Sequence, residues 1–339
     1  MKEALLWEKL DDGRVICQLC NHFCTIAQSH TGICKVRQNQ EGELVSLNYG
    51  KLIAAHIDPI EKKPLFHFLP GSHSYSIAAP GCNFRCAWCQ NWDISQLNKA
   101  NHPSRLAYTQ PEAIVEAALN SGCESISYTY TEPTIFYEYV LDVSKLAKQA
   151  GLKNVLVSNG YMSDAMLDEY IPYLDAINVD IKAFDEKIHR KYTGAKLEPV
   201  LSNCKRLKKA GVWLEITTLL IPGINDDQAQ VEGIAEFVAT ELGTDTPWHI
   251  SRYFPQTQFQ EREATPPVTI LSAMKTGKAK GLQYVYAGNL GKGEDTYCPQ
   301  CGKRLVSRSS VWLMENKIVD NLCPDCQTKI AGVWSGDGE

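Results

Sequence analysis

The stretch SYSIAAPGCNFRCAWC, residues 74–89, sets the interpretation of the rest of the sequence. Its first seven residues predict a strand that runs straight into a loop with three cysteines, Cys82, Cys86 and Cys89. Three thiolates on one loop can hold three irons of a [4Fe–4S] cluster, for which thiolate is the preferred ligand. The fourth iron would then be open for chemistry. The alternative is a zinc knuckle that a distant histidine completes.

Beyond this loop, short β-rich runs alternate with helical stretches. The predicted strands are residues 74–80, 125–130, 154–158, 176–181, 212–220 and 249–253. The predicted helices are residues 111–121, 135–150, 163–174, 200–210, 228–242 and 269–280. Six βα units imply an α/β fold whose parallel sheet is covered by helices. An open sheet and a barrel both satisfy this pattern, and periodicity does not distinguish them.

Polar residues gather where the predicted strands end. The carboxyl ends of parallel strands meet at one edge, where the active sites of such folds form. Besides the cysteines, the polar residues at or near these positions are Thr131, Glu132, Ser158, Asn159, Asp180, Lys182, Glu215, Thr217, His249 and Arg252. We therefore expect these side chains to converge on one site.

Several of these residues also have a purely structural explanation. Glu132 precedes Pro133 and could be an acid favoured by the dipole of a helix N-terminus. Asp180 and Lys182 alternate on a strand and so share a face, which is either the barrel interior or an exposed surface. His249 could be a buried, hydrogen-bonded core histidine.

Eleven of the thirteen cysteines fall into three groups, of four, three and four. The C-terminal group has the spacing of a zinc ribbon, with rubredoxin-like iron as the alternative, and comprises Cys298, Cys301, Cys323 and Cys326. The N-terminal group suits structural zinc or a fully ligated second cluster, and comprises Cys17, Cys20, Cys24 and Cys34. Cys123 and Cys204 stand alone, and we expect them to be small buried apolar residues.

Composition and charge argue against several classes of protein. The chain has 339 residues, 44% of them hydrophobic, and a formal net charge of -5, which argues against a strongly basic nucleic-acid binder. No apolar run approaches the roughly 20 residues of a membrane span, and the charged start lacks the apolar region of a signal peptide. We therefore expect a cytoplasmic protein, in which clustered cysteines are more often metal ligands than disulfides.

Three parts are expected along the chain. Residues 1–73 form an N-terminal four-cysteine module and a connector, and residues 74–295 form the core. The connector, residues 58–71, has three prolines and a glycine and is expected to be extended; Lys62, Lys63 and His67 in it could recognise an anion, but we expect a solvated turn. Residues 296–339 form a module similar to a zinc ribbon.

The chain resembles the radical S-adenosylmethionine superfamily, and more narrowly the AmmeMemoRadiSam-system radical enzymes, relatives of the pyruvate formate-lyase activating enzymes. The residues that carry the resemblance are Pro80–Asn91 (PGCNFRCAWCQN), Tyr128–Thr134 (YTYTEPT), Val179–Lys182 (VDIK) and Ile221–Gly223 (IPG), together with the two outer cysteine groups. The resemblance implies a partial (β/α)6 radical-SAM barrel. It also implies reductive cleavage of S-adenosylmethionine to methionine and a 5′-deoxyadenosyl radical that abstracts hydrogen from a substrate.

The same resemblance implies site residues and partners. The residues expected to contact S-adenosylmethionine are Trp88, Thr131, Glu132, Asn159, Asp180, Lys182, Thr217 and His249. The expected partners are a reductant such as flavodoxin or ferredoxin, and Memo-like and AMMECR-like proteins. The substrate stays open between a glycine Cα of a partner protein, a small molecule and an RNA base. A hypothesis from another class is a redox- or iron-sensing module without turnover.

Overall fold

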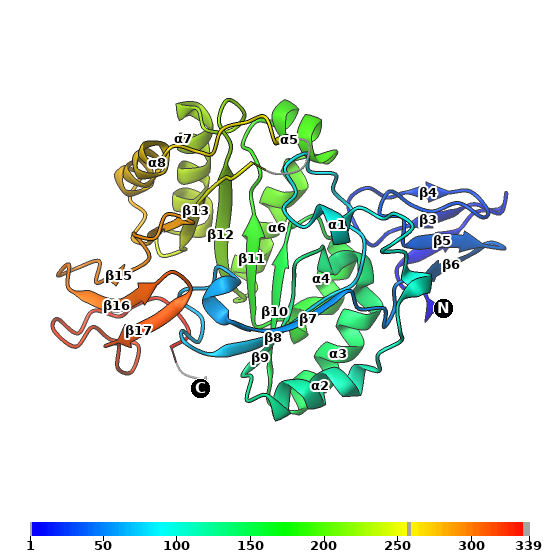
Figure 1. Ribbon diagram of the computed structural model, residues 1–339, viewed down its shortest axis with the longest axis horizontal. Helices are drawn as coiled ribbons and strands as arrows, with labels where there is room; N and C mark the ends of the chain where they lie inside the picture. The colour runs from blue at the N-terminus through cyan, green and yellow to red at the C-terminus, as the bar shows by residue number, and fades with distance from the viewer. Residues whose placement is uncertain (1, 256–258, 335–339) are drawn as a thin grey trace.

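The computed structural model describes residues 2–255 and 259–334, and its centre is one curved sheet (Figure 1). The sheet has eight strands in the order β14-β13-β12-β11-β10-β9-β8-β7. The strands are β7 (Ala54–Pro59), β8 (His73–Ala78), β9 (Ser125–Tyr128), β10 (Lys153–Ser158), β11 (Ala176–Asp180), β12 (Trp213–Leu220), β13 (Trp248–Arg252) and β14 (Val285–Gly288). Strands β8 to β14 are parallel to their neighbours, and β7 is antiparallel to β8.

This sheet confirms the α/β partial barrel and corrects two details. All six predicted strands form, within two residues of their expected ends. The sequence pattern missed β14, a short strand whose four residues carry no alternation of their own. It also missed β7, because the proline-rich segment after it suggested an extended connector; the sheet thus includes residues ahead of Ser74.

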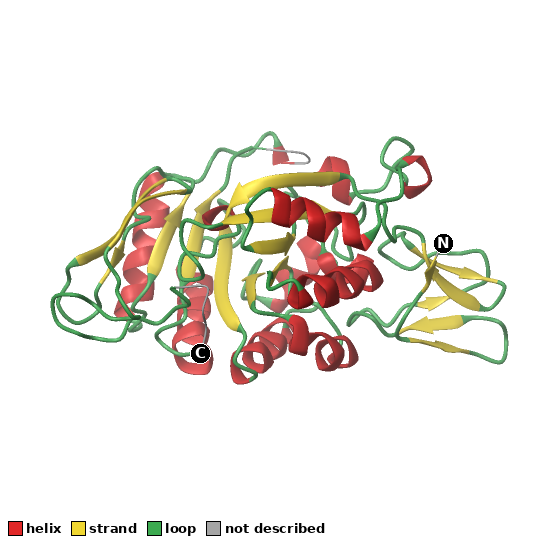
Figure 2. Ribbon diagram, turned by 90° about the horizontal axis from the view of Figure 1, so that it is seen from below, coloured by secondary structure: helices red, strands yellow, loops and turns green. Residues whose placement is uncertain are grey.

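Helices connect the parallel strands. They are α1 (Trp92–Ser95), α2 (Pro111–Asn120), α3 (Tyr137–Gln149), α4 (Asp164–Tyr170), α5 (Glu186–Thr193), α6 (Glu198–Lys209), α7 (Gln228–Phe237) and α8 (Pro267–Ala279). Helix α3 packs on β9 and β10, α6 on β12, and α8 on β13 and β14, so that helices follow the outside of the curved sheet (Figure 2). Helix α5 was not predicted, because its eight residues are largely charged and its apolar side is narrow. No described helix has the length and apolar character that crossing a membrane requires.

The N-terminal cysteine module consists of two small three-stranded sheets beside one end of the barrel (Figure 1). Its strands are β1 (Lys2–Glu3), β2 (Trp7–Lys9), β3 (Val15–Cys17), β4 (Thr25–Ile26), β5 (Arg37–Gln40) and β6 (Glu43–Ser46). Its buried side chains, among them Val15 and Ile26, belong to the same apolar core as the barrel. A buried ion pair between Arg37 and Glu138 of α3, 2.8 Å long, adds a polar tie. The module is therefore packed into the barrel.

The C-terminal module lies on the opposite side of the barrel from the N-terminal module (Figure 1). It is an antiparallel sheet of β15 (Thr296–Tyr297), β16 (Arg304–Ser309) and β17 (Trp312–Asn316). Arg308 on β16 donates to the carbonyl oxygen of Phe66 at 2.6 Å and to that of Glu294 at 2.9 Å. This buried arginine joins the module to the segment that follows β7.

That segment, residues 60–71, fills the inside of the sheet instead of running over the surface. Lys63 is 1% exposed, and its ammonium group lies 2.6 Å from the carboxylate of Asp58 and over the ring of Tyr130. The amides of Phe66 and His67 donate to the carboxylate of Glu215 on β12 at 3.0 and 2.8 Å. The connector predicted from its prolines is thus part of the core.

Breaking the Arg37–Glu138 pair should destabilise the whole protein. In Glu138→Gln the arginine keeps its buried charge but loses its counter-ion, which we expect to cost about 3–5 kcal/mol of the free energy of unfolding. Chemical denaturation followed by circular dichroism measures this cost. The control is Lys2→Ala, which breaks an exposed pair with Asp142 and should change stability by less than about 1 kcal/mol. Equal losses of stability in the two variants would contradict the expected cost of breaking the buried Arg37–Glu138 pair.

Candidate active site and metal centres

The three-cysteine loop leaves β8 at the carboxyl edge of the sheet and ends at α1. Two of its sulfur atoms already have polar neighbours: the amide of Phe84 donates to Sγ of Cys82 at 3.3 Å, and the hydroxyl of Ser95 lies 3.3 Å from Sγ of Cys89. Burial raises the pKa of the Cys82 thiol well above its usual range and that of the Cys86 thiol to about 12. A bound metal deprotonates such thiols outright, and N–H or O–H donors then stabilise the sulfurs.

A chain of hydrogen bonds fixes this loop to the two neighbouring strand ends. The side-chain amide of Asn159, directly after β10, donates to Oδ1 of Asn83 at 2.7 Å. The backbone amide of Asn159 donates to Oε2 of Glu132 at 2.9 Å, and the hydroxyl of Ser158 donates to Oε1 at 2.8 Å. Glu132 is 2% exposed; burial raises the pKa of its carboxyl group, while these donors oppose the rise. Glu132 also caps the short 3-10 helix Pro133–Phe136 through Thr134, so its structural explanation holds as well.

The turn after β9 is held from both sides. The side-chain amide of Asn91 donates to the carbonyl oxygen of Tyr130 at 2.7 Å, and the hydroxyl of Thr131 donates to that of Ala79 at 2.7 Å. Tyr130 has a φ of 62°, an uncommon conformation for a residue other than glycine. The turn from Tyr130 to Glu132 is therefore kept in one shape beside the cysteine loop.

Asp180 and Lys182 form an ion pair of 2.8 Å at the end of β11. Their side chains are 25% and 17% exposed, so they are not the freely solvated surface charges of the alternative explanation. Burial alone would lower the pKa of Lys182, but Asp180 and the nearby Cys86 raise it above its usual value. The pair gives the site a fixed cation next to the cysteine loop.

Thr217 and His249 lie inside their strands, and the expectation that both occupy strand ends is wrong. Strand β12 continues to Leu220 and β13 to Arg252, because both strands are longer at this edge than β11. Thr217 is aligned with Asp180 across the sheet, and its hydroxyl is buried without a hydrogen-bond partner. The Nε2 atom of His249 lies 2.6 Å from the carboxylate of Glu215, which places this histidine in the buried network around the connector.

Trp88 lies behind the loop. It is 2% exposed, and its ring packs against Tyr192 and Phe259, with centroids 5.7 and 6.1 Å away. In the described structure this tryptophan is a buried packing residue behind the cysteine loop.

Two polar residues of this site escaped the sequence analysis: Asn83 and Asn91. Asn83 and Asn91 lie within the PGCNFRCAWCQN stretch, so their closeness to the cysteines was the available signal. Ser158 was expected at this edge together with Asn159, and its hydroxyl donates to Glu132.

Comparison with known proteins identifies the family. The model of the radical SAM superfamily matches residues 76–237. An uncharacterized protein of Methanocaldococcus jannaschii is 43% identical over 336 residues, which is 98% of each chain. The chain belongs to the radical SAM superfamily. The pyruvate formate-lyase 1-activating enzyme of Escherichia coli is 23% identical over 159 residues, 46% of this chain and 65% of that enzyme.

Solved structures agree on the fold. A radical SAM methyltransferase from Sphaerobacter thermophilus matches with a TM-score of 0.50 and 15% identity, over 70% of this chain and 71% of that one. At this identity the likeness concerns the fold alone.

The radical SAM cofactors, a [4Fe–4S] cluster and S-adenosylmethionine, fit the residues at this edge. The cysteine loop offers three thiolates and the N–H and O–H donors that stabilise them. The unpartnered hydroxyl of Thr217 and the Asp180–Lys182 pair provide polar groups for a bound ligand.

The C-terminal cysteines form a closed four-thiol site. The sulfur atoms of Cys298, Cys301, Cys323 and Cys326 all lie within 4.8 Å of one another. Two of the separations, Cys298–Cys326 and Cys301–Cys323, are 3.5 and 3.8 Å. Four thiolates about 2.3 Å from one zinc would lie about 3.8 Å apart, so these separations suit a single tetrahedral metal. Cys123 and Cys204 are 5% and 0% exposed, which confirms their expected burial.

Removing one ligand should empty this C-terminal site. We expect Cys323→Ser to lose about one equivalent of metal per chain, because a tetrahedral structural site needs all four donors. Metal analysis by mass spectrometry after dialysis measures the loss. Cys123→Ser is the control, since that thiol belongs to none of the three groups, and it should keep the wild-type metal content. Retention of the full content by Cys323→Ser would contradict the assignment.

Proposed function

We propose that Cys82, Cys86 and Cys89 hold a [4Fe–4S] cluster with one open iron, and that the carboxyl edge of the sheet binds S-adenosylmethionine for reductive cleavage. The observation that carries the proposal is the three-cysteine loop, held against the Asp180–Lys182 pair and the Asn83–Asn159–Glu132 chain of hydrogen bonds. When bound, the cluster supplies one electron to the sulfonium of S-adenosylmethionine, and cleavage gives methionine and a 5′-deoxyadenosyl radical that abstracts hydrogen from a substrate.

The protein side chains bind and orient the cofactor in this proposal. The Tyr130–Glu132 turn, fixed by Asn91 and Thr131, presents its backbone to the amino group of the methionine moiety. Lys182 supplies a positive charge for a carboxylate, and Asp180 accepts from hydroxyl or amino groups. Thr217 offers its unpartnered hydroxyl. We leave His249 out of the binding set, because Glu215 already engages it.

The substrate is proposed only by class. The likeness to an activating enzyme for pyruvate formate-lyase supports hydrogen abstraction from a glycine Cα of a partner protein as one candidate. Memo-like and AMMECR-like proteins are proposed partners in a shared modification pathway. A flavodoxin or ferredoxin is the proposed electron donor. A sensing module without turnover is less well supported, since it does not need a polar site beside an open cluster.

We also propose zinc as the metal of the C-terminal site and a reducing compartment, such as the cytoplasm, as the place of function. The sulfur spacing of Cys298 and its three partners supports a single tetrahedral ion. Three groups of reduced cysteines suit a compartment in which thiols are kept reduced.

The cluster assignment predicts the behaviour of Cys86→Ala. This variant should lose cleavage of S-adenosylmethionine by at least about 10³-fold, because two thiolates do not hold the cluster for chemistry. Formation of 5′-deoxyadenosine by the anaerobically reconstituted protein with dithionite is the measurement. Cys123→Ala should behave as the wild type. Cleavage that persists in Cys86→Ala, or is absent from a wild-type protein with its full iron content, would overturn the proposal.

The role of the ion pair predicts a binding defect in Asp180→Asn. We expect about a tenfold higher Kd for S-adenosylmethionine, corresponding to about 1.4 kcal/mol, because Lys182 loses the partner that orients it. Equilibrium binding to the unreduced protein measures this effect apart from turnover. Asp175→Asn is the matched control, because Asp175 pairs with Lys153 where strands β10 and β11 begin, at the edge of the sheet away from the cysteine loop. An unchanged Kd in Asp180→Asn would show that the Asp180–Lys182 pair takes no part in binding S-adenosylmethionine.

A further inference from the structure

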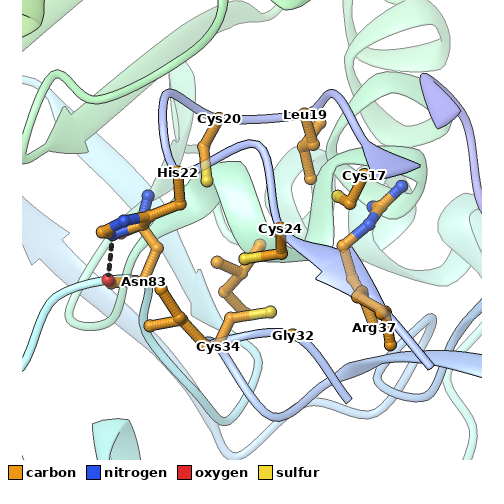
Figure 3. Close-up of a pocket in the computed structure, with 12 residues that line it drawn as sticks. Cys17, Leu19, Cys20, His22, Cys24, Gly32, Cys34, Arg37 and Asn83 are labelled. Atoms are coloured by element: carbon orange, nitrogen blue, oxygen red, sulfur yellow. Dashed lines mark hydrogen bonds between the residues drawn. The ribbon is translucent and has the colours of Figure 1, made fainter. Parts of the chain in front are cut away.

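The N-terminal cysteines surround one cavity. Cys17 ends β3, Cys20 and Cys24 follow in the next loop, and Cys34 lies in the loop before β5. All four line the same pocket, together with Arg37 and four apolar side chains (Figure 3). The apolar residues are Leu19, Ile26, Ile33 and Ile135. Four thiols in an apolar shell are a donor set for a metal centre shielded from water.

Two buried nitrogen donors that line this cavity have no hydrogen-bond partner. Arg37 is 1% exposed; its two terminal nitrogens donate to Glu138 and to the carbonyl oxygen of Leu5, but Nε has no acceptor. Asn83 is also 1% exposed, and its Nδ2 has no acceptor. A buried donor without a partner costs free energy, so both atoms indicate a missing acceptor. Thiolate and inorganic sulfide are such acceptors, and they would lie in this cavity.

The distances between the sulfur atoms distinguish this N-terminal site from the C-terminal one. Among the described residues, no three of the N-terminal thiols have sulfur atoms all within 4.8 Å of one another, whereas the four C-terminal sulfurs do. One zinc draws four sulfurs close together, because all bind the same ion. In a cubane cluster each thiolate binds its own iron, so the sulfurs stand farther apart. The N-terminal sulfurs therefore lack the close spacing that one ion imposes, and a cluster does not require it.

The cavity adjoins the loop of the open cluster. Nε2 of His22 lies 2.9 Å from the carbonyl oxygen of Asn83, which follows Cys82 in the sequence (Figure 3). On the other side of Cys82, Gly81 has a φ of 109°, and a Cβ there would lie 3.2 Å from the carbonyl oxygen of Cys34. The positive φ of Gly81 is a conformation that other residues rarely adopt, and the two backbones lie close together there. The residues before and after Cys82 thus both contact the N-terminal cysteine module.

We propose that Cys17, Cys20, Cys24 and Cys34 bind a second [4Fe–4S] cluster, which receives one electron from a low-potential donor protein and passes it to the cluster of the Cys82 loop. The transfer moves a single electron and exchanges no proton or bond. The donor protein reduces the N-terminal cluster and is itself oxidised. The N-terminal cluster then reduces the cluster of the Cys82 loop and is reoxidised. This proposal rests on the proposed function for its second step. The orphaned donors Arg37 and Asn83 would then donate to cluster sulfurs and tune the potential.

Metal content tests the first step. In Cys82→Ala/Cys86→Ala/Cys89→Ala, reconstituted anaerobically, we expect about four irons and four sulfides per chain and an electron paramagnetic resonance signal after dithionite. S-adenosylmethionine should not change this signal, because a fully ligated cluster has no open iron. Cys24→Ala/Cys34→Ala should also keep about four irons, and S-adenosylmethionine should change its signal. Cys123→Ala should keep all of them, about eight.

The outcomes are distinguishable. A triple variant with no iron and one more zinc than the C-terminal site takes would overturn the second cluster. A second cluster in the triple variant, combined with no effect of S-adenosylmethionine on Cys24→Ala/Cys34→Ala, would overturn the proposed function and leave the second cluster standing.

Spin coupling tests the transfer step without a variant that must remain active. If the clusters are close enough to exchange electrons, the spectrum of the fully reduced wild-type protein should be broader than the sum of the spectra of the two variants. A wild-type spectrum equal to that sum would overturn transfer between the clusters. With reduced flavodoxin as donor, we also expect the Cys82-loop cluster of Cys24→Ala/Cys34→Ala to be reduced at least about tenfold more slowly than in the wild type. Equal rates of reduction in this variant and in the wild type would also overturn transfer between the clusters.

Discussion

The carboxylate of Glu132 is the interaction on which the active edge depends. It is buried, and it accepts from the backbone of Asn159 and from the hydroxyls of Ser158 and Thr134. A buried carboxylate is tolerated only when such donors satisfy it, so its presence fixes where these groups lie. Two neighbouring strands, β9 and β10, therefore end in a defined relation to each other.

Asn159 extends this order to the cysteine loop. Its backbone binds Glu132 while its side chain binds Asn83, the residue after Cys82. A loop that must bind a cluster gains from such support, because second-shell hydrogen bonds orient the ligands of a metal site. Asn159 thus supports both the cysteine loop and the turn after β9.

The sequence predicted the parts whose pattern is local. The cysteine spacing identified the loop, and the strand-and-helix alternation placed six strands to within two residues. It placed Glu215 and His249 among the polar residues of the active edge, but it did not predict the buried network that they form with His67, because the three residues come from distant segments. The same holds for Lys63 and Asp58: two lysines in a proline-rich stretch suggest a solvated turn, and only the buried carboxylate shows why Lys63 is inside. Contacts between distant segments carry no periodic signal.

The three cysteine groups differ in how the fold spaces their sulfurs, and this difference follows from where each group is attached. The C-terminal knuckles face each other across a small antiparallel sheet, which brings four sulfurs to the spacing of one ion. The N-terminal thiols come from β3 and two loops that are packed into the barrel core, so their spacing is set by packing against residues such as Ile135. The middle group has only three cysteines, and the Asp180–Lys182 pair lies beside it at the carboxyl edge of the sheet. The ribbon lies on the opposite side of the barrel, whereas the N-terminal four-thiol cavity lies against Asn83, so the proposed second cluster would stand beside the proposed cluster of the Cys82 loop, where it could deliver electrons to it.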